Sequence, residues 1–182
     1  MLIHITGASG SGTSTLGAAL AAEVGGVHLD ADAYYWLPTT PPFTHKRPAA
    51  ERLALLLADL PSHPTCVLAG SVVDPTCVLA GSVVGWGDAL EDAFDLVVFL
   101  YLDAAVRVER LRRREIEQLG HADPAFLEWA AQYDTGPPVG RSLAKHRAWL
   151  ARRHCRVIEL HGDMSVSARV SAVLQAWPAA RL

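Results

Sequence analysis

The sequence lacks the features that would place it in a membrane, in an oxidising compartment or on nucleic acid. No apolar stretch approaches the roughly 18–20 residues that a membrane-spanning helix needs. The three cysteines, Cys66, Cys77 and Cys155, include no CxxC pair and are too few for a disulfide framework. The net charge is −3, which predicts no general nucleic-acid surface. We therefore expect a cytoplasmic protein whose partners include neither a membrane nor a nucleic-acid polymer.

Metal-ligand spacing is also missing, since the eight histidines form no HExxH motif. His4 lies inside the apolar run LIHIT (residues 2–6), which favours a core histidine over a metal ligand. The chain has 182 residues, of which 51% are hydrophobic and 19% are charged. This size and composition predict a single globular domain over residues 1–182.

The strongest motif is the glycine-rich stretch GASGSGTST (residues 7–15). A phosphate-binding loop has the pattern G-x-x-x-x-G-K-[ST], and Gly7, Gly12 and Ser14 occupy their positions in it. Thr13 stands where the pattern has lysine. A short apolar strand is expected before the stretch, and a helix with apolar residues four apart is expected after it. This is the setting that such a loop requires.

The loop predicts a site for nucleotide phosphates. Glycines allow successive backbone N–H groups to point into one concavity, and the N-terminus of the following helix adds partial positive charge. The Ser14 hydroxyl is placed to bind Mg²⁺. The predicted phosphate-binding residues are Gly7, Ser9, Gly10, Ser11, Gly12, Thr13, Ser14 and Thr15. Without the lysine charge, either arginines from elsewhere complete the site or turnover is weak. A glycine-rich turn without a ligand is the plain alternative.

Strands and helices alternate along the rest of the chain, and short connections between them imply parallel strands. Further strands are expected at 27–30, 95–102 and 155–160, with one more between 64 and 84. Helices are expected at 49–60, after Asp103, at 141–152 and at 165–176. The sequence therefore predicts an α/β fold with a doubly wound, mostly parallel five-stranded sheet.

One segment is duplicated. The sequence PTCVLAGSVV occurs at 64–73 and again at 75–84, with Asp74 between the copies. Each copy predicts one buried strand and a glycine turn, and the sheet has a place for one of them. The second copy continues directly into GWGDAL, so we expect it in the sheet. The first copy is then an insertion, an edge strand or an exchanged strand.

Charged residues at the expected carboxyl edge of the sheet are candidate catalytic groups. Asp30 and Asp32 follow the second strand, where ligands bind in open α/β sheets. A carboxylate there can accept the proton of an attacking hydroxyl or orient Mg²⁺. Arg107, Arg110 and Arg114 share one helix face and would neutralise phosphate charge during transfer. The simpler alternatives are a pair of turn carboxylates and a solvated helix face paired with glutamates.

Together these motifs resemble the adenylate-kinase-like family of P-loop kinases, which includes nucleoside-monophosphate and shikimate-type kinases. The resemblance rests on GASGSGTST, on DAD (30–32), on DLVVFLYL (95–102) followed by RVERLRRRE, and on a proline-broken segment at 120–140. The stretches DADAYYWLPTTPPFTHKR and AGSVVGWGD resemble a bacterial subgroup of this family described as P-loop ATPases.

The resemblance implies an acceptor-binding insertion at 33–60, a lid at 120–140, and lid or lid-hinge roles for the three arginines. The implied acceptor-site residues are Asp32, Tyr35, Arg47, Gly81, Trp86 and Arg141. The expected function is transfer of the γ-phosphoryl group of ATP, with Mg²⁺, to a small-molecule or nucleotide acceptor. Thr13 favours an alternative, a nucleotide-sensing module with weak or no turnover, and a simple ATPase is a third function. We expect a monomer or homodimer, in which the duplicated segment permits strand exchange.

Overall fold

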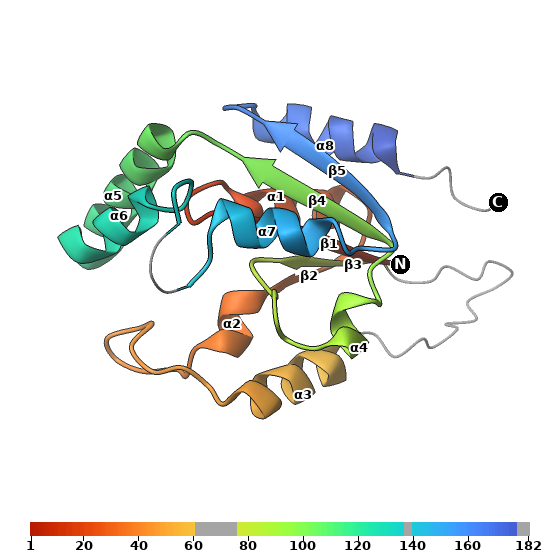
Figure 1. Cartoon of the computed structure of the whole chain (residues 1–182), viewed down its shortest axis with the longest axis horizontal. Helices are drawn as coiled ribbons and strands as arrows, with labels where there is room; N and C mark the ends of the chain where they lie inside the picture. Colours follow the sequence, from red (N-terminus) through yellow and green to blue (C-terminus); the bar gives the residue numbers. More distant parts are fainter. Residues whose placement is uncertain (61–75, 137–139, 178–182) are drawn as a thin grey trace, which may run out of the picture.

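The computed structural model describes residues 1–60, 76–136 and 140–177, and its centre is a five-stranded sheet (Figure 1). The strand order is β2-β3-β1-β4-β5, and every neighbouring pair is parallel. The strands are β1 (Leu2–Gly7), β2 (Val27–Asp30), β3 (Cys77–Ala80), β4 (Leu96–Tyr101) and β5 (Arg156–His161). The predicted α/β class is therefore confirmed.

Helices cover both faces of the sheet, which explains why its central strands are continuous apolar runs. On one face, α1 (Thr13–Glu23) and α8 (Val166–Ala176) pack around Ile5, Leu20 and Val173. The other face carries α2 (Ala31–Tyr35), α3 (Ala49–Asp59), α4 (Asp88–Glu91) and α7 (Leu143–Leu150). α5 (Ala104–Leu119) and α6 (Pro124–Ala131) form a separate apolar cluster at the left of Figure 1.

The second copy of the duplicated segment forms β3, as the sequence predicts. Its residues Cys77–Ala80 are all buried and pair with β1 on one side and with β2 on the other. The first copy, at 64–73, lies outside the described residues. The described sheet therefore takes its third strand from the copy that continues into GWGDAL.

The two segments expected to surround an acceptor contain the helices that the sequence predicts at 49–60 and within PAFLEWAAQY (124–133), and the first segment also holds the end of α2, which the sequence does not predict. The expected insertion at 33–60 includes the end of α2, a loop in which Trp36 and Lys46 form an isolated antiparallel bridge, and α3. The expected lid at 120–140 contains α6, which packs on α5, while residues 137–139 lie outside the described part. None of the described helices is both long enough and apolar enough to span a membrane.

Candidate functional site

The glycine loop connects the carboxyl end of β1 to the N-terminus of α1. Gly10 and Gly12 have φ values of 79° and 92°, a left-handed conformation that favours glycine. Gly12 is the N-cap of α1, and the first turn of this helix contains no acidic residue. The partial positive charge at the helix N-terminus is therefore not neutralised locally and can attract an anion.

The loop packs closely against β4 and α5, which explains two of its glycines. A Cβ atom at Gly7 would lie 2.6 Å from the carbonyl oxygen of Leu100, and one at Gly10 would lie 2.6 Å from the carbonyl oxygen of Arg107. Both contacts are with backbone, so neither position has room for a side chain. The shape of the loop is thus set by its neighbours.

The loop hydroxyls differ in exposure. Ser11 is buried, and its Oγ has no hydrogen-bond partner among the described residues. Thr13 is half-buried, whereas Ser14 presents its side chain to solvent, as a metal ligand would. In the described part of the chain, no group of three His, Cys, Asp or Glu residues could hold a metal. Mg²⁺ that is bound largely through phosphates and water needs no such group.

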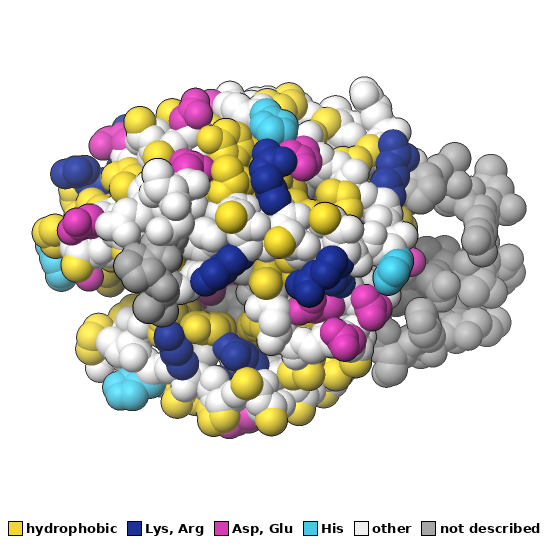
Figure 2. Space-filling view, viewed as in Figure 1, with side chains coloured by type: hydrophobic (Ala, Val, Ile, Leu, Met, Phe, Trp, Pro, Cys, Tyr) yellow, Lys and Arg dark blue, Asp and Glu magenta, His cyan; other side chains and the backbone are white. Residues whose placement is uncertain are grey.

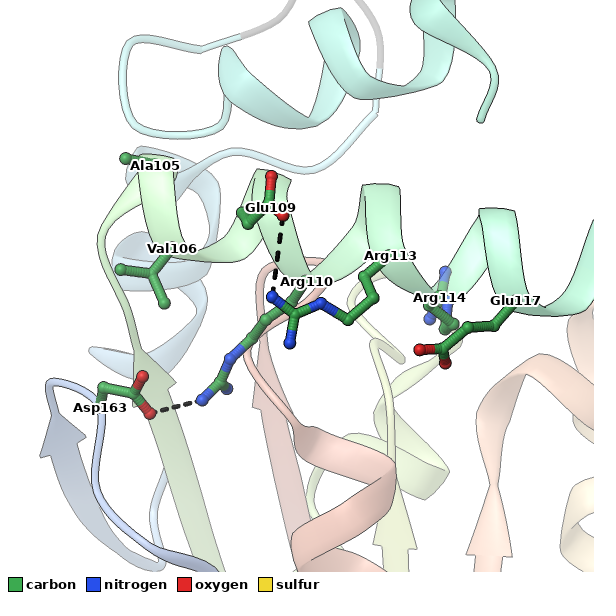
Figure 3. A pocket seen from close by; sticks show the side chains of 8 residues that line it. All are labelled: Ala105, Val106, Glu109, Arg110, Arg113, Arg114, Glu117 and Asp163. Atoms are coloured by element: carbon green, nitrogen blue, oxygen red, sulfur yellow. Dashed lines mark hydrogen bonds and ion pairs between the residues drawn. The ribbon is translucent and has the colours of Figure 1, made fainter. Parts of the chain in front are cut away.

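Two guanidinium groups converge on Gly12. A Cβ atom at Gly12 would lie 3.0 Å from Nη1 of Arg169 and 4.0 Å from Nη1 of Arg110. Arg110, on α5, is partly exposed and forms an ion pair with Asp163 (Figure 3). Guanidinium groups therefore lie near Gly12 from both α5 and α8.

Arg169 is a residue that sequence reasoning missed. It is only 5% exposed, and it donates from Nη1 to the carbonyl oxygen of Ser11 at 2.8 Å and from Nη2 to that of Gly162 at 3.1 Å. The available signal is its spacing: Arg169 lies four residues before the buried Val173, on the face that α8 turns to the core. An arginine on an apolar helix face indicates a specific partner.

The basic face of α5 runs from the core to the solvent. Arg107 is fully buried, and it donates to the carbonyl oxygens of Leu102 and Ala130 and to the carboxylate of Asp134. All three of its nitrogens are thus engaged in holding α5 against its surroundings, so the structure gives Arg107 a structural role in place of the expected catalytic one. Arg114, two turns further along, is exposed.

A cavity of about 620 Å³ lies along the exposed side of α5 (Figure 3). Its lining residues are Ala105, Val106, Glu109, Arg110, Arg113, Arg114, Glu117 and Asp163. In Figure 3, Arg110 extends to Asp163 and Arg113 extends to Glu109, so both guanidinium groups have carboxylate partners. Because Arg110 borders both this cavity and Gly12, the cavity adjoins the glycine loop.

Asp30, the last residue of β2, and Asp32, in α2, have different surroundings. Asp30 is the N-cap of α2, and its Oδ1 accepts the backbone N–H of Asp32 at 2.9 Å. Asp32 is exposed to solvent, but nearby protein partly desolvates its carboxyl and raises its pKa, while the charges of Arg141 and Arg114 oppose that rise. The charges of two predicted arginines, one on α5 and one before α7, therefore act on the predicted Asp32 of α2.

A smaller cavity of about 280 Å³ opens beside Asp32. Trp36 and Phe43 line it, together with prolines of the 37–43 loop and Arg47. Arg47 already pairs with Glu51 at 2.6 Å, so its charge is balanced locally. Figure 2 shows basic side chains on both sides of the recess between the part formed by α2 and α3 and the part formed by α5 to α7.

Tyr35 and Trp86, both predicted acceptor residues, enclose a guanidinium group that sequence reasoning missed. Arg52 lies 4.8 Å from the ring centroid of Tyr35 and 5.1 Å from that of Trp86, and its buried Nε has no partner among the described residues. Gly81 has a φ of 111°, and a Cβ there would lie 2.7 Å from the Cβ of Ala31. The end of β3 therefore lies directly against α2.

A hydrogen-bonded chain links the end of β3 to α7. Ser82 Oγ is 3.3 Å from Nε2 of His146, and Nδ1 of His146 is 2.7 Å from the hydroxyl of Tyr133. Burial lowers the pKa of His146 to about 4, and the charge of Arg141 acts in the same direction. His146 is therefore neutral at pH 7, and it ties the turn after β3 to the region that carries Arg141.

The chain is similar to one protein in sequence and to several solved kinase structures in fold. No protein-family model matches the chain. A Bacillus subtilis protein described as the uncharacterised protein YqaC is 43% identical to it over 182 residues, covering 94% of each chain. A gluconokinase structure from Sinorhizobium meliloti has a TM-score of 0.56 at 20% identity and covers 95% of this chain and 89% of its own. A shikimate kinase structure from Bacteroides thetaiotaomicron has a TM-score of 0.56 at 16% identity and covers 97% of each chain. These structures share the fold of adenylate-kinase-like P-loop kinases with this chain.

Proposed function

Because the chain belongs to the same family as Bacillus subtilis YqaC and has the fold of adenylate-kinase-like P-loop kinases, we propose that it is an ATP-dependent phosphotransferase for a small hydroxyl-bearing acceptor. The observation that carries the proposal is a convergence at one edge of the sheet. The glycine loop after β1, with guanidinium groups beside Gly12, lies at the same edge as Asp32, which is influenced by Arg114 and Arg141. Phosphoryl transfer needs such a combination of a phosphate cradle, cations and a carboxylate.

In this proposal the loop amides and the N-terminus of α1 bind the phosphates of ATP, and the cavity along α5 receives the nucleoside. Ala105 and Val106 offer apolar contact, and the guanidinium groups of Arg110 and Arg114 can stack on an aromatic base or contact phosphate. The cavity volume of about 620 Å³ falls in the range of about 300–1,000 Å³ that is typical of small-molecule sites.

The exposed hydroxyl of Ser14 fits a Mg²⁺ ion that is held mainly by phosphates. When bound, this ion would neutralise part of the phosphate charge. Asp30, at the end of β2, and Asp32, at the start of α2, would hold water molecules that are bound to this ion. Ser14 is therefore the direct protein ligand in the proposal, and the aspartates contribute through water.

Asp32 is the proposed base and orienting group for the acceptor hydroxyl. Desolvation raises the pKa of its carboxyl, so the group accepts a proton more readily than an ordinary aspartate does. Arg114 and Arg141 act on Asp32 from two other elements and would stabilise the charge that develops on the transferred phosphoryl group. Closure of the 120–140 segment, proposed as a lid, would bring Arg141 closer and exclude water.

We propose that the acceptor is a small molecule with hydroxyl groups and one anionic group. The cavity beside Asp32 has aromatic walls and includes Arg47, and Arg52 lies between Tyr35 and Trp86 with a buried Nε that has no partner among the described residues. Two structural neighbours are named for gluconate and shikimate, which combine hydroxyl groups with a carboxylate. A nucleotide acceptor, whose anionic group is phosphate, is the second candidate of this class.

Thr13 favours a different function, a module that binds nucleotide without efficient turnover. A threonine hydroxyl cannot supply the charge-assisted contact of a lysine, which is about twice as strong as a neutral hydrogen bond. The two functions share the nucleotide site and differ in the fate of the γ-phosphoryl group. A simple ATPase would release phosphate without any acceptor.

Calorimetric titration with Mg·ATP, followed by product analysis with hydroxy acids, sugars and nucleotides, tests the proposal. A phosphorylated product supports the kinase, binding without any product supports the sensing module, and phosphate release without an acceptor supports the ATPase. No binding of Mg·ATP would rule out all three functions.

Asp32→Asn tests the catalytic assignment. We expect kcat to fall by about 10²–10⁴-fold, the usual contribution of a general base, with little change in Mg·ATP affinity. Asp88→Asn, at an exposed aspartate in α4, is the matched control and should leave both quantities unchanged. Wild-type turnover in Asp32→Asn would show that the base lies elsewhere.

A further inference from the structure

We propose that Arg169, on the last helix, supplies the positive charge that the lysine of a phosphate-binding loop would otherwise provide. The inference rests on the proposed nucleotide-binding function and assigns the residue that supports it when position 13 is threonine. Arg169 is a positioning residue, because its guanidinium acts on bound phosphate through the loop and does not touch the reacting atoms.

The contacts of Arg169 place its charge against the carbonyl side of the loop. Nη1 donates to the carbonyl oxygen of Ser11 at 2.8 Å, and it lies 3.0 Å from the point where a Cβ would project from Gly12. Nη2 donates to the carbonyl oxygen of Gly162 at 3.1 Å, which fixes the plane of the guanidinium. The charge therefore adjoins the residue immediately before Thr13.

The burial of Arg169 indicates that its charge is retained for a partner. The side chain is 5% exposed, its Nε has no hydrogen-bond partner, and it forms no ion pair with a carboxylate in the described residues. Asp163 attracts this charge from beyond ion-pair distance while Arg110 repels it, so the buried charge is only partly compensated, and a bound polyphosphate would complete the compensation. Arg110 differs, because it is partly exposed and already paired with Asp163.

Arg169 can act on phosphate through a single peptide unit. The carbonyl oxygen of Ser11 and the N–H of Gly12 belong to the same amide, and a charged donor at the oxygen polarises that amide. The Gly12 N–H then becomes a stronger donor to an anion in the loop. Direct attraction adds to this effect, because the surrounding protein has a lower dielectric constant than water.

Calorimetry on the full chain, with Mg·ATP and with inorganic tripolyphosphate as probes, tests the inference. Arg169→Gln removes the charge but keeps a side-chain N–H near the Ser11 carbonyl group. We expect it to weaken both probes by about tenfold, whereas Arg169→Lys, which keeps the charge, should weaken them by less than about threefold. Equal affinity in a folded Arg169→Gln variant would overturn the inference.

Arg156→Gln is the matched control. Arg156 also donates to a carbonyl oxygen of α8, that of Ala176 at 2.6 Å, but it lies at the first residue of β5. The glycine loop is at the opposite end of the parallel sheet, so this substitution should leave both affinities unchanged. A similar loss in Arg156→Gln would mean that any arginine in contact with α8 affects binding, and it would count against a local effect of Arg169.

Rescue by a lysine at position 13 separates an electrostatic role from a structural one. Adding Thr13→Lys to Arg169→Gln should restore the affinity for both probes to within about threefold of wild type. A folded double variant that shows no recovery would overturn the proposal.

If Arg169→Gln fails to fold, Thr13→Lys is tested in the intact protein. It should then tighten binding by less than about threefold, and a gain of about a hundredfold would overturn the proposal.

The outcomes also separate this inference from the proposed function. If the wild-type chain binds neither probe, the nucleotide site and the role of Arg169 both fail. If the wild type binds them and Arg169→Gln binds them equally well, only the role of Arg169 fails.

Discussion

Replacing Glu91 by alanine should destabilise the fold more than any surface substitution. Glu91 is the last residue of α4, and its buried carboxylate joins this helix to the preceding turn and to α7. It accepts hydrogen bonds from the backbone N–H groups of Gly85 (2.6 Å) and Trp86 (3.1 Å) and from Nε1 of Trp149 (2.5 Å). It also pairs with Nη2 of Arg153 at 3.5 Å.

The size of the effect follows from the burial of this ion pair. The side chains of Arg153 and Glu91 are 6% and 7% exposed, so solvent and salt screen the pair very little. Removing one partner of a buried ion pair costs about 3–5 kcal/mol of unfolding free energy, because the other charge stays buried. Arg153 keeps one carboxylate contact, that of Nη1 with the exposed Asp92 at 3.5 Å, which compensates its charge only weakly. Since a domain of this size loses about 2–4 °C of Tm per kcal/mol, Tm should fall by roughly 6–20 °C.

Urea denaturation and a thermal scan of Glu91→Ala measure this loss. Glu109→Ala is the control, because Glu109 is 59% exposed and its ion pairs with Arg112 and Arg113 are 3.7 and 3.8 Å long. The control should change the unfolding free energy by no more than about 0.5 kcal/mol. A loss below about 1 kcal/mol in Glu91→Ala would refute the reasoning, because a buried charge would then tolerate the loss of its partner.

Two further predictions concern acid and the duplicated segment. Burial lowers the pKa of His4 to about 3 and that of His146 to about 4, so below the ordinary value of about 6.5 the unfolded chain binds protons that the folded chain does not. As the pH falls from about 6.5 to 4, each histidine should therefore remove about 1.4 kcal/mol of unfolding free energy per pH unit. In urea titrations, the unfolding free energy of His146→Gln should depend less steeply on pH than that of the wild type. An equal slope would contradict this prediction. Deleting residues 64–74 leaves residues 60–63, 75 and 76 between α3 and β3, a connection of common length, so Tm should stay the same or rise. A lower Tm would show that the deleted segment belongs to the fold.

The prediction of a parallel five-stranded sheet depends on signals that are local in the sequence, whereas the order of its strands was not predicted. Single stretches of sequence predict a strand or helix together with the element next to it: the glycine loop after LIHIT, the apolar run at 95–102 and the helix after Asp103. Short connections between these elements then favour parallel strands. The choice between the two copies of PTCVLAGSVV was also possible, because only the second leads directly into the turn before α4. Short helices such as α4 escaped prediction, since their residues are held by distant partners such as Trp149.

The roles of individual arginines were harder to predict, because they depend on how elements dock. Spacing correctly places Arg107, Arg110 and Arg114 on one face of α5, but it does not show that α6 covers the first of them. Arg52 falls between two aromatic rings that come from different segments, which no local pattern reveals. Arg169 is the exception, since a charged residue four positions before Val173 on an apolar helix face is visible in the sequence.

The position of Arg169 bears on which of the two main candidate functions the chain performs. A lysine at position 13 would lie on a flexible stem and could follow the γ-phosphoryl group, whereas the guanidinium of Arg169 is held by two carbonyl groups beneath the protein surface. A charge that is fixed in this way stabilises bound and reacting phosphate to a similar extent, and such uniform binding does not raise kcat. In the proposed kinase, acceleration would then come from arginines that can approach the reacting group from the open side, and Arg114 and Arg141 are the candidates, because their charges act on Asp32. In the functions proposed above, the glycine loop and Arg169 would thus account for nucleotide binding, and the basic residues of α5 and of the segment before α7 would decide whether transfer follows.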